Sequence, residues 1–497
     1  MGKLAGLAPE KVFQFFEELC GIPHGSYHID EISDYLAAFA KERGLSCTQD
    51  KEKNILVRLP ASTGYEEEPV LILQGHMDMV AVHDDPAVDM KVTPLAVTHD
   101  AQWVYAQRSS LGGDDGIAVA MMMALMDDPA IPHPPLELLI TTNEEVGMDG
   151  AIGLDASLLK GTRLLNLDSE DEGIFTVGCA GGVRVVAGLD LSDIASDELA
   201  VLDGAADKDN SVAGVSMKVS VSGLQGGHSG QMIHLGRANA LRVLARVLLE
   251  AQKRFPVGLS AFCGGTACNA IPMAAEMEVV VRREDREAFA DWLRLEETIL
   301  RHEYKGKDDG LHINASVLQE EAVSAHTVLQ STTAARFLVA APDGVQAMSG
   351  VVNGLVETSL NCGIAELKDG VLTVYFELRS MIGSAAQALR DRVVAVAEAF
   401  GATAEVSASY PEWEYREQSP LREKMVRIYR NMYHKDPVVE VIHAGLECGV
   451  LAKKIGDFDA VSIGPDMQDI HTTRERLSIE SVRRTWEFVL EVLRDKE

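Results

Sequence analysis

The chain has 497 residues, of which 46% are hydrophobic and 24% charged, values typical of a folded globular protein and not of a disordered one. This length exceeds what one ordinary core organises, so we expect two domains. The net charge of -31 argues against nucleic-acid binding and against docking on anionic membranes, because both need patches of lysine and arginine.

The seven cysteines are spaced singly and contain no Cys-x-x-Cys pair, a pattern that fits a reducing compartment and not a disulfide framework. The first twenty residues contain no long apolar stretch followed by a cleavage site, as a secretion signal would need. The apolar run at 116–126 is too short to cross a bilayer. We therefore expect a cytoplasmic protein without a membrane partner.

The first third of the chain alternates helical and strand-like patterns. Apolar residues at helical spacing predict helices over 12–19 and 30–39, and a third helix is predicted over 116–128. Short Val/Ile/Leu runs predict strands within 54–60, 69–78, 136–147 and 162–173. This alternation indicates an α/β layer with a largely parallel sheet, in which functional side chains gather beyond the carboxyl ends of the strands.

The middle of the chain, from about residue 184 to 404, has a different pattern. Strands with polar alternation are predicted at 216–223, 274–283 and 370–380, and a long helix at 237–255. Two of these strands end near an arginine, Arg282 and Arg379, which leaves an internal duplication open. The α/β pattern returns at about 405 and ends in a helix near 478–495. We therefore expect an α/β domain over 1–183 and 405–497, split by an inserted α+β domain over 184–404.

Histidines and acids stand at or just after the ends of several apolar runs. Crowded carboxylates repel one another unless a cation neutralises them, and two histidines among acids suit Zn²⁺, Mn²⁺ or Co²⁺ better than Ca²⁺ or Mg²⁺. A pair of such ions needs a bridging carboxylate and a free one for proton transfer. Each residue alone fits a helix cap, a solvated turn or a surface position, but their joint occurrence favours a site. The group comprises His76, Asp78, Asp114, Asp115, Glu144, Glu145, Asp168 and His471.

The ordered segments HMD, GGDDG, NEEVG and NLDSE, with the late His471, resemble the dinuclear zinc peptidases of the M20 metallopeptidase family. Further segments, among them GLQGGHSG, NAIP, FELRS and HAGLECG, resemble its cytosolic non-specific dipeptidase branch, the aminoacyl-histidine dipeptidases, over nearly the whole chain. The resemblance implies a phosphorylase/hydrolase-like α/β zinc-peptidase catalytic domain with an inserted α+β lid domain. Relatives pair through that inserted domain, so a homodimer is expected.

Carried over by position, the resemblance implies that Asp114 bridges two divalent metal ions, Zn²⁺ in the first place, with Mn²⁺ or Co²⁺ as alternatives. His76 and Asp168 complete one metal site, and Glu145 and His471 complete the other.

The resemblance also implies roles for residues that bind no metal. Glu144 is the expected general base, which takes a proton from the attacking water and returns it to the leaving amine. Asp78 is expected to orient His76, and His228 to stabilise the oxyanion. Arg379 and Asn269 are candidates for binding the terminal carboxylate of the substrate, although a surface arginine and a turn asparagine are equally good interpretations.

The expected function is metal-dependent hydrolysis of short peptides, chiefly dipeptides, with broad specificity that includes Xaa-His. Two alternatives stay open: an M20-type amidohydrolase acting on N-acyl amino acids, and a non-catalytic peptide-binding relative. The segment that begins at His471 reads HTTRE where this branch carries His-Ser-Pro-Asp-Glu, so the loop beside that ligand is expected to differ.

Overall fold

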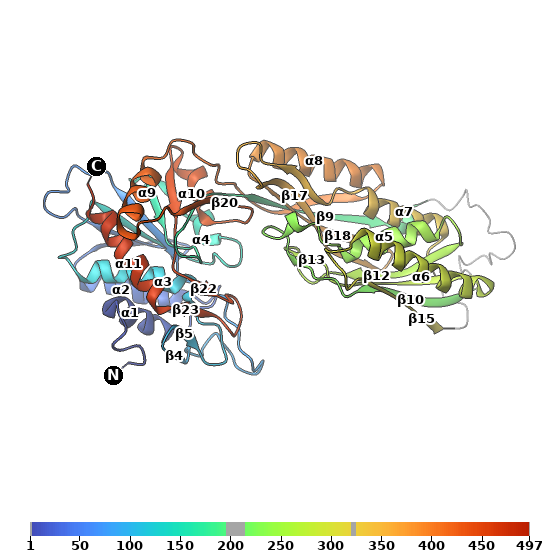
Figure 1. Ribbon diagram of the computed structural model, residues 1–497, viewed down its shortest axis with the longest axis horizontal. Coiled ribbons are helices and arrows are strands. Elements are labelled where there is room, and N and C mark those ends of the chain that lie inside the picture. The colour runs from blue at the N-terminus through green and yellow to red at the C-terminus, as the bar shows by residue number, and fades with distance from the viewer. Residues whose placement is uncertain (1, 195–213, 320–324, 497) are drawn as a thin grey trace. The chain divides into compact units, whose positions relative to one another are not determined.

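The computed structural model describes residues 2–194, 214–319 and 325–496, and the chain divides into two compact units. Unit 1 comprises Met1–Cys179, Trp413–Val441 and Leu446–Glu497, and unit 2 comprises Ala180–Glu412 and Ile442–Gly445. The chain thus leaves unit 1 after its first third and returns to it near residue 413, as the colours of Figure 1 show.

Unit 1 is built on an eight-stranded sheet with the strand order β1-β2-β6-β3-β7-β21-β8-β20. Strands β6, β3, β7 and β21 run parallel to one another, whereas β2 pairs antiparallel with β1 and β6, and β8 pairs antiparallel with β21. A small sheet of β22, β23, β5 and β4 completes the unit. The elements are α1 (Glu10–Cys20), α2 (Asp30–Glu42), β1 (Ser46–Gln49), β2 (Ile55–Leu59), β3 (Leu71–His76), β4 (Val97–His99), β5 (Trp103–Ala106), α3 (Gly113–Asp127), β6 (Leu136–Thr141), α4 (Asp149–Gly153), β7 (Arg163–Asn166), β8 (Ile174–Cys179), α9 (Pro420–Tyr433), β20 (Val438–Ile442), α10 (Glu447–Ile455), β21 (Asp459–Ser462), β22 (Met467–Gln468), β23 (Arg476–Ser478) and α11 (Ile479–Arg494).

Helix α3 lies at the centre of unit 1, packed between strand β3 and helix α1. Every residue from Gly113 to Met126 is buried, because no charged side chain occurs between Asp115 and Asp127. A helix that is apolar on all sides is stable only inside a core. The buried helix therefore fixes the position of its first turn, and this turn carries Asp114.

The parallel centre of the sheet brings the predicted site segments to one edge. Strand β3 ends at His76, β6 ends three residues before Glu144, and β7 ends two residues before Asp168. Because β3 pairs in parallel with both β6 and β7, these three carboxyl ends are neighbours. The α/β fold class expected from the sequence is confirmed, whereas the sheet is parallel only at its centre and not largely parallel as expected.

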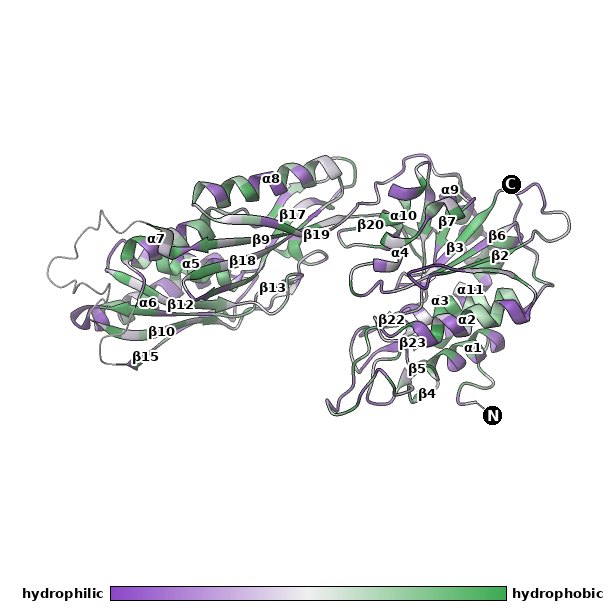
Figure 2. Cartoon of the chain, turned by 180° about the vertical axis from the view of Figure 1, so that it is seen from behind, coloured by the Kyte–Doolittle hydropathy of each residue, from purple (hydrophilic) through white to green (hydrophobic). Residues whose placement is uncertain are grey.

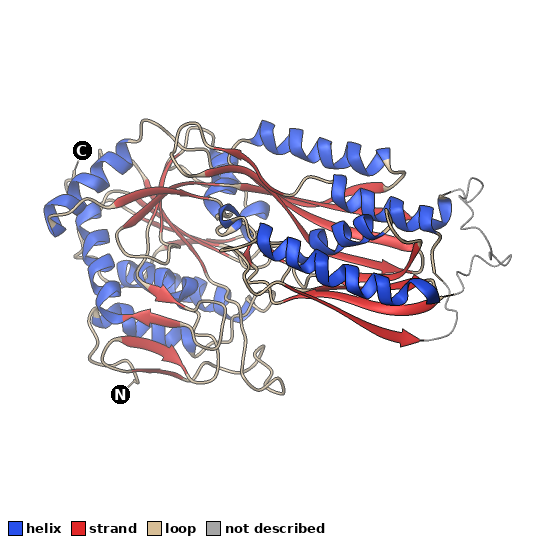
Figure 3. Ribbon diagram, turned by 45° about the vertical axis from the view of Figure 1, so that its right-hand side comes forward, coloured by secondary structure: helices blue, strands red, loops and turns tan. Residues whose placement is uncertain are grey.

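Unit 2 contains a nine-stranded antiparallel sheet with the order β15-β10-β14-β12-β17-β18-β9-β19, in which β16 pairs with β17. Helices α5, α6, α7 and α8 contribute to a single core with this sheet and lie along one of its faces (Figures 1 and 3). The elements are β9 (Gly181–Asp190), β10 (Val215–Ser222), β11 (Gly227–His228), α5 (Ala240–Ala251), β12 (Val257–Gly264), β13 (Ala270–Ile271), β14 (Ala275–Val281), α6 (Arg286–Glu303), β15 (His312–Gln319), α7 (Val328–Ala340), β16 (Gly344–Met348), β17 (Val356–Lys368), β18 (Val371–Ser380), α8 (Gly383–Ala399) and β19 (Thr403–Tyr410).

Strand β10 shows why this sheet has one covered face. Val215, Met217, Val219 and Val221 are buried in the core, whereas the residues between them are polar. Side chains alternate between the two faces of a strand, so this spacing gives one apolar and one polar face. Figure 2 shows hydrophobic residues along the strands of the sheet, while α8 carries both kinds.

The joints between the units lie at 179/180 and 412/413, a few residues from the 183/184 and 404/405 expected from the sequence. The difference arises because β9 begins at Gly181 and pairs along its length with β19, which ends at Tyr410. Strand pairing, and not a change in composition, sets these boundaries. Within the described ranges, no helix has both the length and the apolar character needed to cross a bilayer.

Candidate functional site

Asp114 lies between two histidines at the carboxyl edge of the unit 1 sheet. Its Oδ1 is 3.1 Å from Nε2 of His76, and its Oδ2 is 3.2 Å from Nε2 of His471. His76 ends strand β3, whereas His471 lies 357 positions beyond Asp114 on a turn in which its φ is +59°. Each oxygen of one carboxylate thus faces a different imidazole, which is the arrangement expected of a bridging ligand.

Two further carboxylates complete the cluster. Glu145 Oε1 lies 2.9 Å from His471 Nε2, and Asp168 Oδ1 lies 3.5 Å from His76 Nε2. Potential ligand atoms of His76, Asp114 and Glu145 lie within 4.8 Å of one another. The structure therefore brings together all five residues predicted as metal ligands.

The charges of the cluster call for cations. Burial lowers the pKa of His471, but the neighbouring carboxylates of Asp114 and Glu145 outweigh it and raise the pKa to about 11. Burial likewise lowers the pKa of His76, yet Asp168 and Asp114 hold it well above its ordinary value. Protons on the imidazoles thus offset the carboxylates in the metal-free protein, and divalent cations would offset them in their place.

A buried oxygen of Glu145 that accepts no hydrogen bond also fits metal ligation. Glu145 Oε1 is buried and, despite its proximity to His471, accepts no hydrogen bond of acceptable geometry. A buried carboxylate oxygen without a donor is costly, and ligation of a cation would satisfy it. The donor set of two imidazoles and three carboxylates suits borderline transition metals such as Zn²⁺.

Asp78 lies behind His76, but its side chain is not the nearest partner of the imidazole. His76 Nδ1 is 2.9 Å from the main-chain carbonyl of Asp78 and 3.5 Å from its Oδ1. The Asp78 carboxylate accepts hydrogen bonds from Ser26 Oγ at 2.8 Å and from the Glu144 main-chain N–H at 3.1 Å. Asp78 therefore orients His76 mainly through its backbone, and its side chain holds the segment that carries Glu144.

Asp115 is a second buried acid beside the ligands that the sequence could not separate from Asp114. Its Oδ2 accepts the His76 main-chain N–H at 3.3 Å, and potential ligand atoms of Asp115, His76 and Asp168 also lie within 4.8 Å of one another. The acid fits there because residue 75 is glycine, since a Cβ on Gly75 would lie 2.3 Å from Asp115 Oδ2. Its contact with the backbone of β3 indicates a structural role.

A buried glutamate that the sequence did not reveal as important forms hydrogen bonds with two central strands, β3 and β6. Glu447 is fully buried, and its Oε2 accepts hydrogen bonds from Gln74 on β3, at 2.6 Å, and Thr141 on β6, at 2.5 Å. Burial raises the pKa of Glu447 to about 8. The segment HAGLECG contains this residue, but its sequence does not indicate that the glutamate contacts both strands.

Unit 2 brings two of the predicted residues together with a third that was not predicted. Around Gly230, an added Cβ would lie 3.0 Å from His228 Cε1, 3.2 Å from Arg379 Cδ and 2.2 Å from the carbonyl oxygen of His443. The side chains of His228 and Arg379 and the backbone of His443 thus surround one glycine of the GGHSG segment. His443 lies in the HAGLECG segment, so the motif was recognised without a role for this residue.

Two nitrogens of this cluster are buried without partners. Among the residues that the structure describes, none offers a hydrogen-bond partner to Arg379 Nε or His443 Nδ1, and the two residues are only 5% and 6% exposed. Ser359 Oγ lies 2.7 Å from His443 Nε2, so a hydrogen bond donated by Ser359 leaves the imidazole hydrogen on Nδ1. Burial lowers the pKa of His443 to about 3, with Arg379 contributing, and the imidazole is neutral near pH 7. The arginine therefore supplies the charge of this cluster.

Asn269 is less clearly part of the cluster. Its main-chain carbonyl accepts the Ser229 N–H at 2.8 Å, next to the pairing of His228 with Ala270, but its side chain is exposed. The backbone of Asn269 thus fixes the segment that carries His228.

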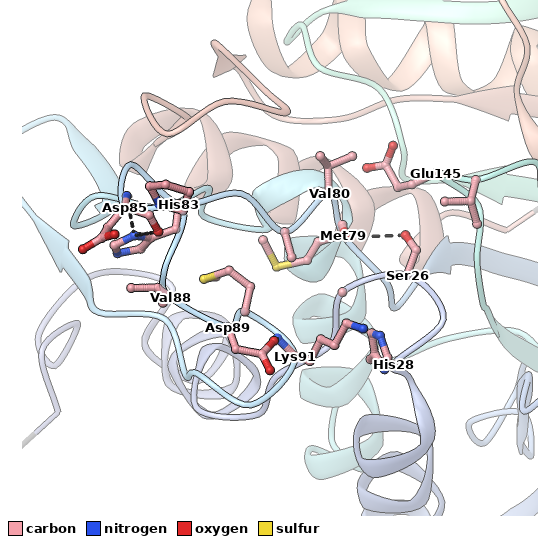
Figure 4. A pocket seen from close by; sticks show the side chains of 15 residues that line it. Ser26, His28, Met79, Val80, His83, Asp85, Val88, Asp89, Lys91 and Glu145 are labelled. Carbon is pink, nitrogen blue, oxygen red and sulfur yellow. Dashed lines mark hydrogen bonds between the residues drawn. The ribbon is translucent and has the colours of Figure 1, made fainter.

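A cavity of about 590 Å³ opens beside Glu145, one of the predicted metal ligands, within unit 1. Figure 4 shows Met79, Val80 and Glu145 on one side of it and His83 with Asp85 on the other. Its size lies in the range of sites for small molecules, and Glu145 connects it to the metal ligands. The cavity can therefore take a group attached to a molecule held at those ligands.

Comparisons with known proteins show the family of the chain. Residues 72–495 match the model of peptidase family M20/M25/M40. The chain is 35% identical over its full length to the cytosol non-specific dipeptidase of Escherichia coli K12, of which it covers 99%. A crystal structure of aminoacylhistidine dipeptidase from Vibrio alginolyticus is 32% identical, with a TM-score of 0.83 over 99% of this chain and 98% of that chain.

A more distant structure shares the fold alone. The aminopeptidase PepT of Bacillus cereus is 16% identical, with a TM-score of 0.55 over 98% of each chain. The family match and the two full-length relatives agree with each other, and the chain belongs to peptidase family M20/M25/M40, as a hydrolase of the metallopeptidase type.

Proposed function

We propose that this protein hydrolyses dipeptides of broad sequence, including Xaa-His, with two divalent metal ions and Glu144 as the general base. The observation that carries the proposal is the position of the Asp114 carboxylate between His76 and His471, with one oxygen facing each imidazole. The names of the two full-length relatives, a non-specific dipeptidase and an aminoacylhistidine dipeptidase, support the substrate class.

Five residues would hold the ions: Asp114 as the shared ligand, His76 with Asp168 on one side, and Glu145 with His471 on the other. When bound, a pair of Zn²⁺, Mn²⁺ or Co²⁺ ions polarises the peptide carbonyl and makes water more acidic. The ligand types are compatible with all three metals.

Glu144 is suited to proton transfer by its surroundings. Burial raises the pKa of its carboxyl well above the ordinary value; Asp168 adds to the rise and His76 opposes it. No side chain in the described ranges donates a hydrogen bond to this carboxylate, while its main-chain N–H is held by Asp78. A fixed backbone with an unengaged carboxylate fits a group that takes a proton from water and returns it to the leaving amine.

The cluster in unit 2 is our candidate for recognising the substrate's terminal carboxylate. Arg379 provides the charge, His443 Nδ1 provides a second buried donor, and His228 lies beside both. A carboxylate would satisfy the two unpartnered nitrogens. We assign oxyanion stabilisation to His228, whose pKa is lowered to about 4 by burial and by Arg379, so that it is a neutral donor. Asn269 is a weaker candidate because its side chain is exposed.

We propose that the cavity beside Glu145 accommodates a side chain of the dipeptide. Its lining combines apolar residues such as Val80 with polar ones such as Asp85 and Lys91, which suits broad specificity better than selection of one side chain. A cytoplasmic location is supported by the seven cysteines, all of which are free thiols. The homodimer stays a prediction.

The function is tested by removing metal with a chelator, restoring Zn²⁺, Mn²⁺ or Co²⁺ singly, and measuring hydrolysis of a panel of dipeptides and N-acyl amino acids. We expect no activity without metal and restored cleavage of several dipeptides, Xaa-His among them, since without the ions nothing polarises the peptide carbonyl or makes the attacking water more acidic. Preferential cleavage of N-acyl amino acids, or metal binding without hydrolysis of any peptide, would contradict the proposal.

Glu144→Gln should lower kcat by about 10²–10⁴-fold, the usual contribution of a general base. Because Glu144 is not among the five ligands, the variant should keep both equivalents of metal, measured by plasma mass spectrometry after gel filtration. Turnover close to that of the unaltered protein would exclude Glu144 as the base.

Asp114→Asn should lose metal, because one neutral amide would replace the carboxylate that both imidazoles face. The matched control is Asp85→Asn, which removes a carboxylate from the wall of the neighbouring cavity and should retain the metal. Equal metal content in the two variants would argue against a shared ligand.

His443→Leu should raise KM for a dipeptide by about tenfold to a hundredfold, since a hydrogen bond to a charged group contributes about 1.5–3 kcal/mol. The variant should also discriminate less between a dipeptide and its C-terminal amide, because one donor to the carboxylate is gone. His312→Leu, an exposed histidine of the same unit, serves as the control. An unchanged preference for the free carboxylate would refute the role of His443.

A further inference from the structure

Glu475 is a buried acid whose carboxylate contacts the backbone of the turn that carries Asp114. It is 3% exposed, and its carboxylate accepts four consecutive main-chain N–H groups. Oε2 accepts those of Leu111 at 2.7 Å and Gly112 at 3.1 Å, and Oε1 accepts those of Gly113 at 2.8 Å and Asp114 at 3.5 Å. Glu475 therefore fixes the turn through hydrogen bonds to its backbone.

The two glycines of the turn make this arrangement possible. Gly112 adopts a φ of +68°, which is strained for other residues, and this conformation lets successive N–H groups converge on one anion. An added Cβ on Gly113 would lie 3.3 Å from Glu475 Oε1. The GGD sequence thus creates a concave anion site, and the anion that fills it belongs to the protein itself.

The same glutamate is tied to the turn of the second histidine. Glu475 lies four residues after His471, and its main-chain N–H donates to the carbonyl oxygen of Thr472 at 3.2 Å. Strand β23 begins at the next residue, where Arg476 pairs with Tyr105 of β5. One residue therefore connects the turn of Asp114, the turn of His471 and a fixed strand.

We propose that Glu475 is a positioning residue that sets the separation of Asp114 and His471 and thereby the affinity for metal. This inference rests on the proposed metal centre and adds a residue that positions two of its ligands. Carboxylate ligands bind tightly only when their own placement is fixed, and groups that hold ligands typically change metal affinity or activity by about 10–100-fold when they are altered. The bond from the Asp114 N–H to Glu475 is the one main-chain hydrogen bond that links Asp114 to the segment after His471, within residues 2–194 and 325–496.

Glu475→Gln is the informative change because it keeps the shape of the side chain. The amide can still accept through its oxygen, but its NH2 group would face two backbone N–H donors, so half of the support is lost and replaced by repulsion.

Glu137→Gln is a matched control in the same unit. Glu137 is 1% exposed and accepts the main-chain N–H groups of Lys160 at 2.9 Å and Gly161 at 3.0 Å, at the end of β6 opposite to the metal ligands. It tests whether any loss comes simply from disturbing a buried acid that binds backbone amides.

The experiment is a Zn²⁺ titration of the full chain in competition with a chromophoric chelator, with circular dichroism to verify folding. We expect Glu475→Gln to bind at least one of two equivalents about 10–100-fold more weakly, and Glu137→Gln to match the unaltered protein. With excess Zn²⁺, kcat of Glu475→Gln should recover while KM for a dipeptide stays unchanged, which a general loss of stability would not produce.

Unchanged Zn²⁺ affinity in Glu475→Gln, or an equal loss in Glu137→Gln, would overturn the role of Glu475 while leaving the metal centre intact. Failure of the unaltered protein to bind Zn²⁺ would instead refute the metal centre itself. Should Glu475→Gln fail to fold, Gly113→Ala serves in its place, because the added Cβ presses on Glu475 Oε1. We expect weaker Zn²⁺ binding from it, and unchanged affinity would count against the proposal.

Discussion

The mutual repulsion of carboxylates at one edge of the unit 1 sheet is the constraint on which the rest of the site depends. Asp114, Glu145 and Asp168 lie close together there, and the two histidines among them are held in their protonated form by the surrounding negative charge. Protons on the histidines offset this negative charge in part, and divalent cations at the cluster would offset it in their place. The fold stabilises it from behind: the buried α3 fixes the start of the Asp114 turn, and backbone contacts of Asp78 fix the His76 ring.

The two units hold clusters of different charge. The acids of unit 1 suit cations and the proton transfers proposed for Glu144, whereas the cluster in unit 2 has one arginine and two neutral imidazoles. A dipeptide contains a group that suits each cluster, a polarisable carbonyl for the first and a terminal carboxylate for the second.

Much of this could be predicted from the sequence. The ends of β3, β6 and β7 were recognisable because a parallel sheet leaves apolar runs that stop at polar residues, and the order of the motifs supplied the family. Ligand and base could not be distinguished by composition, since Glu144 and Glu145 are chemically identical neighbours, and the resemblance was needed to assign them. The roles proposed for His443 and Glu475 depend on contacts with distant segments, and no local pattern indicates which backbone a buried side chain will meet. The unit boundaries were displaced for the same reason, because the pairing of β19 with β9 is non-local.

Gly75 illustrates how far the demands of a metal centre extend beyond its ligands. The residue touches no ion and carries no functional group, yet the oxygen of Asp115 occupies the space where its side chain would be. Neighbouring positions such as Ile72 and Leu73 can exchange one aliphatic group for another during evolution with modest repacking. At position 75 even a single methyl group would displace the acid that steadies the backbone of His76. Natural variation should therefore be common at the aliphatic positions of this strand and absent one step before the histidine.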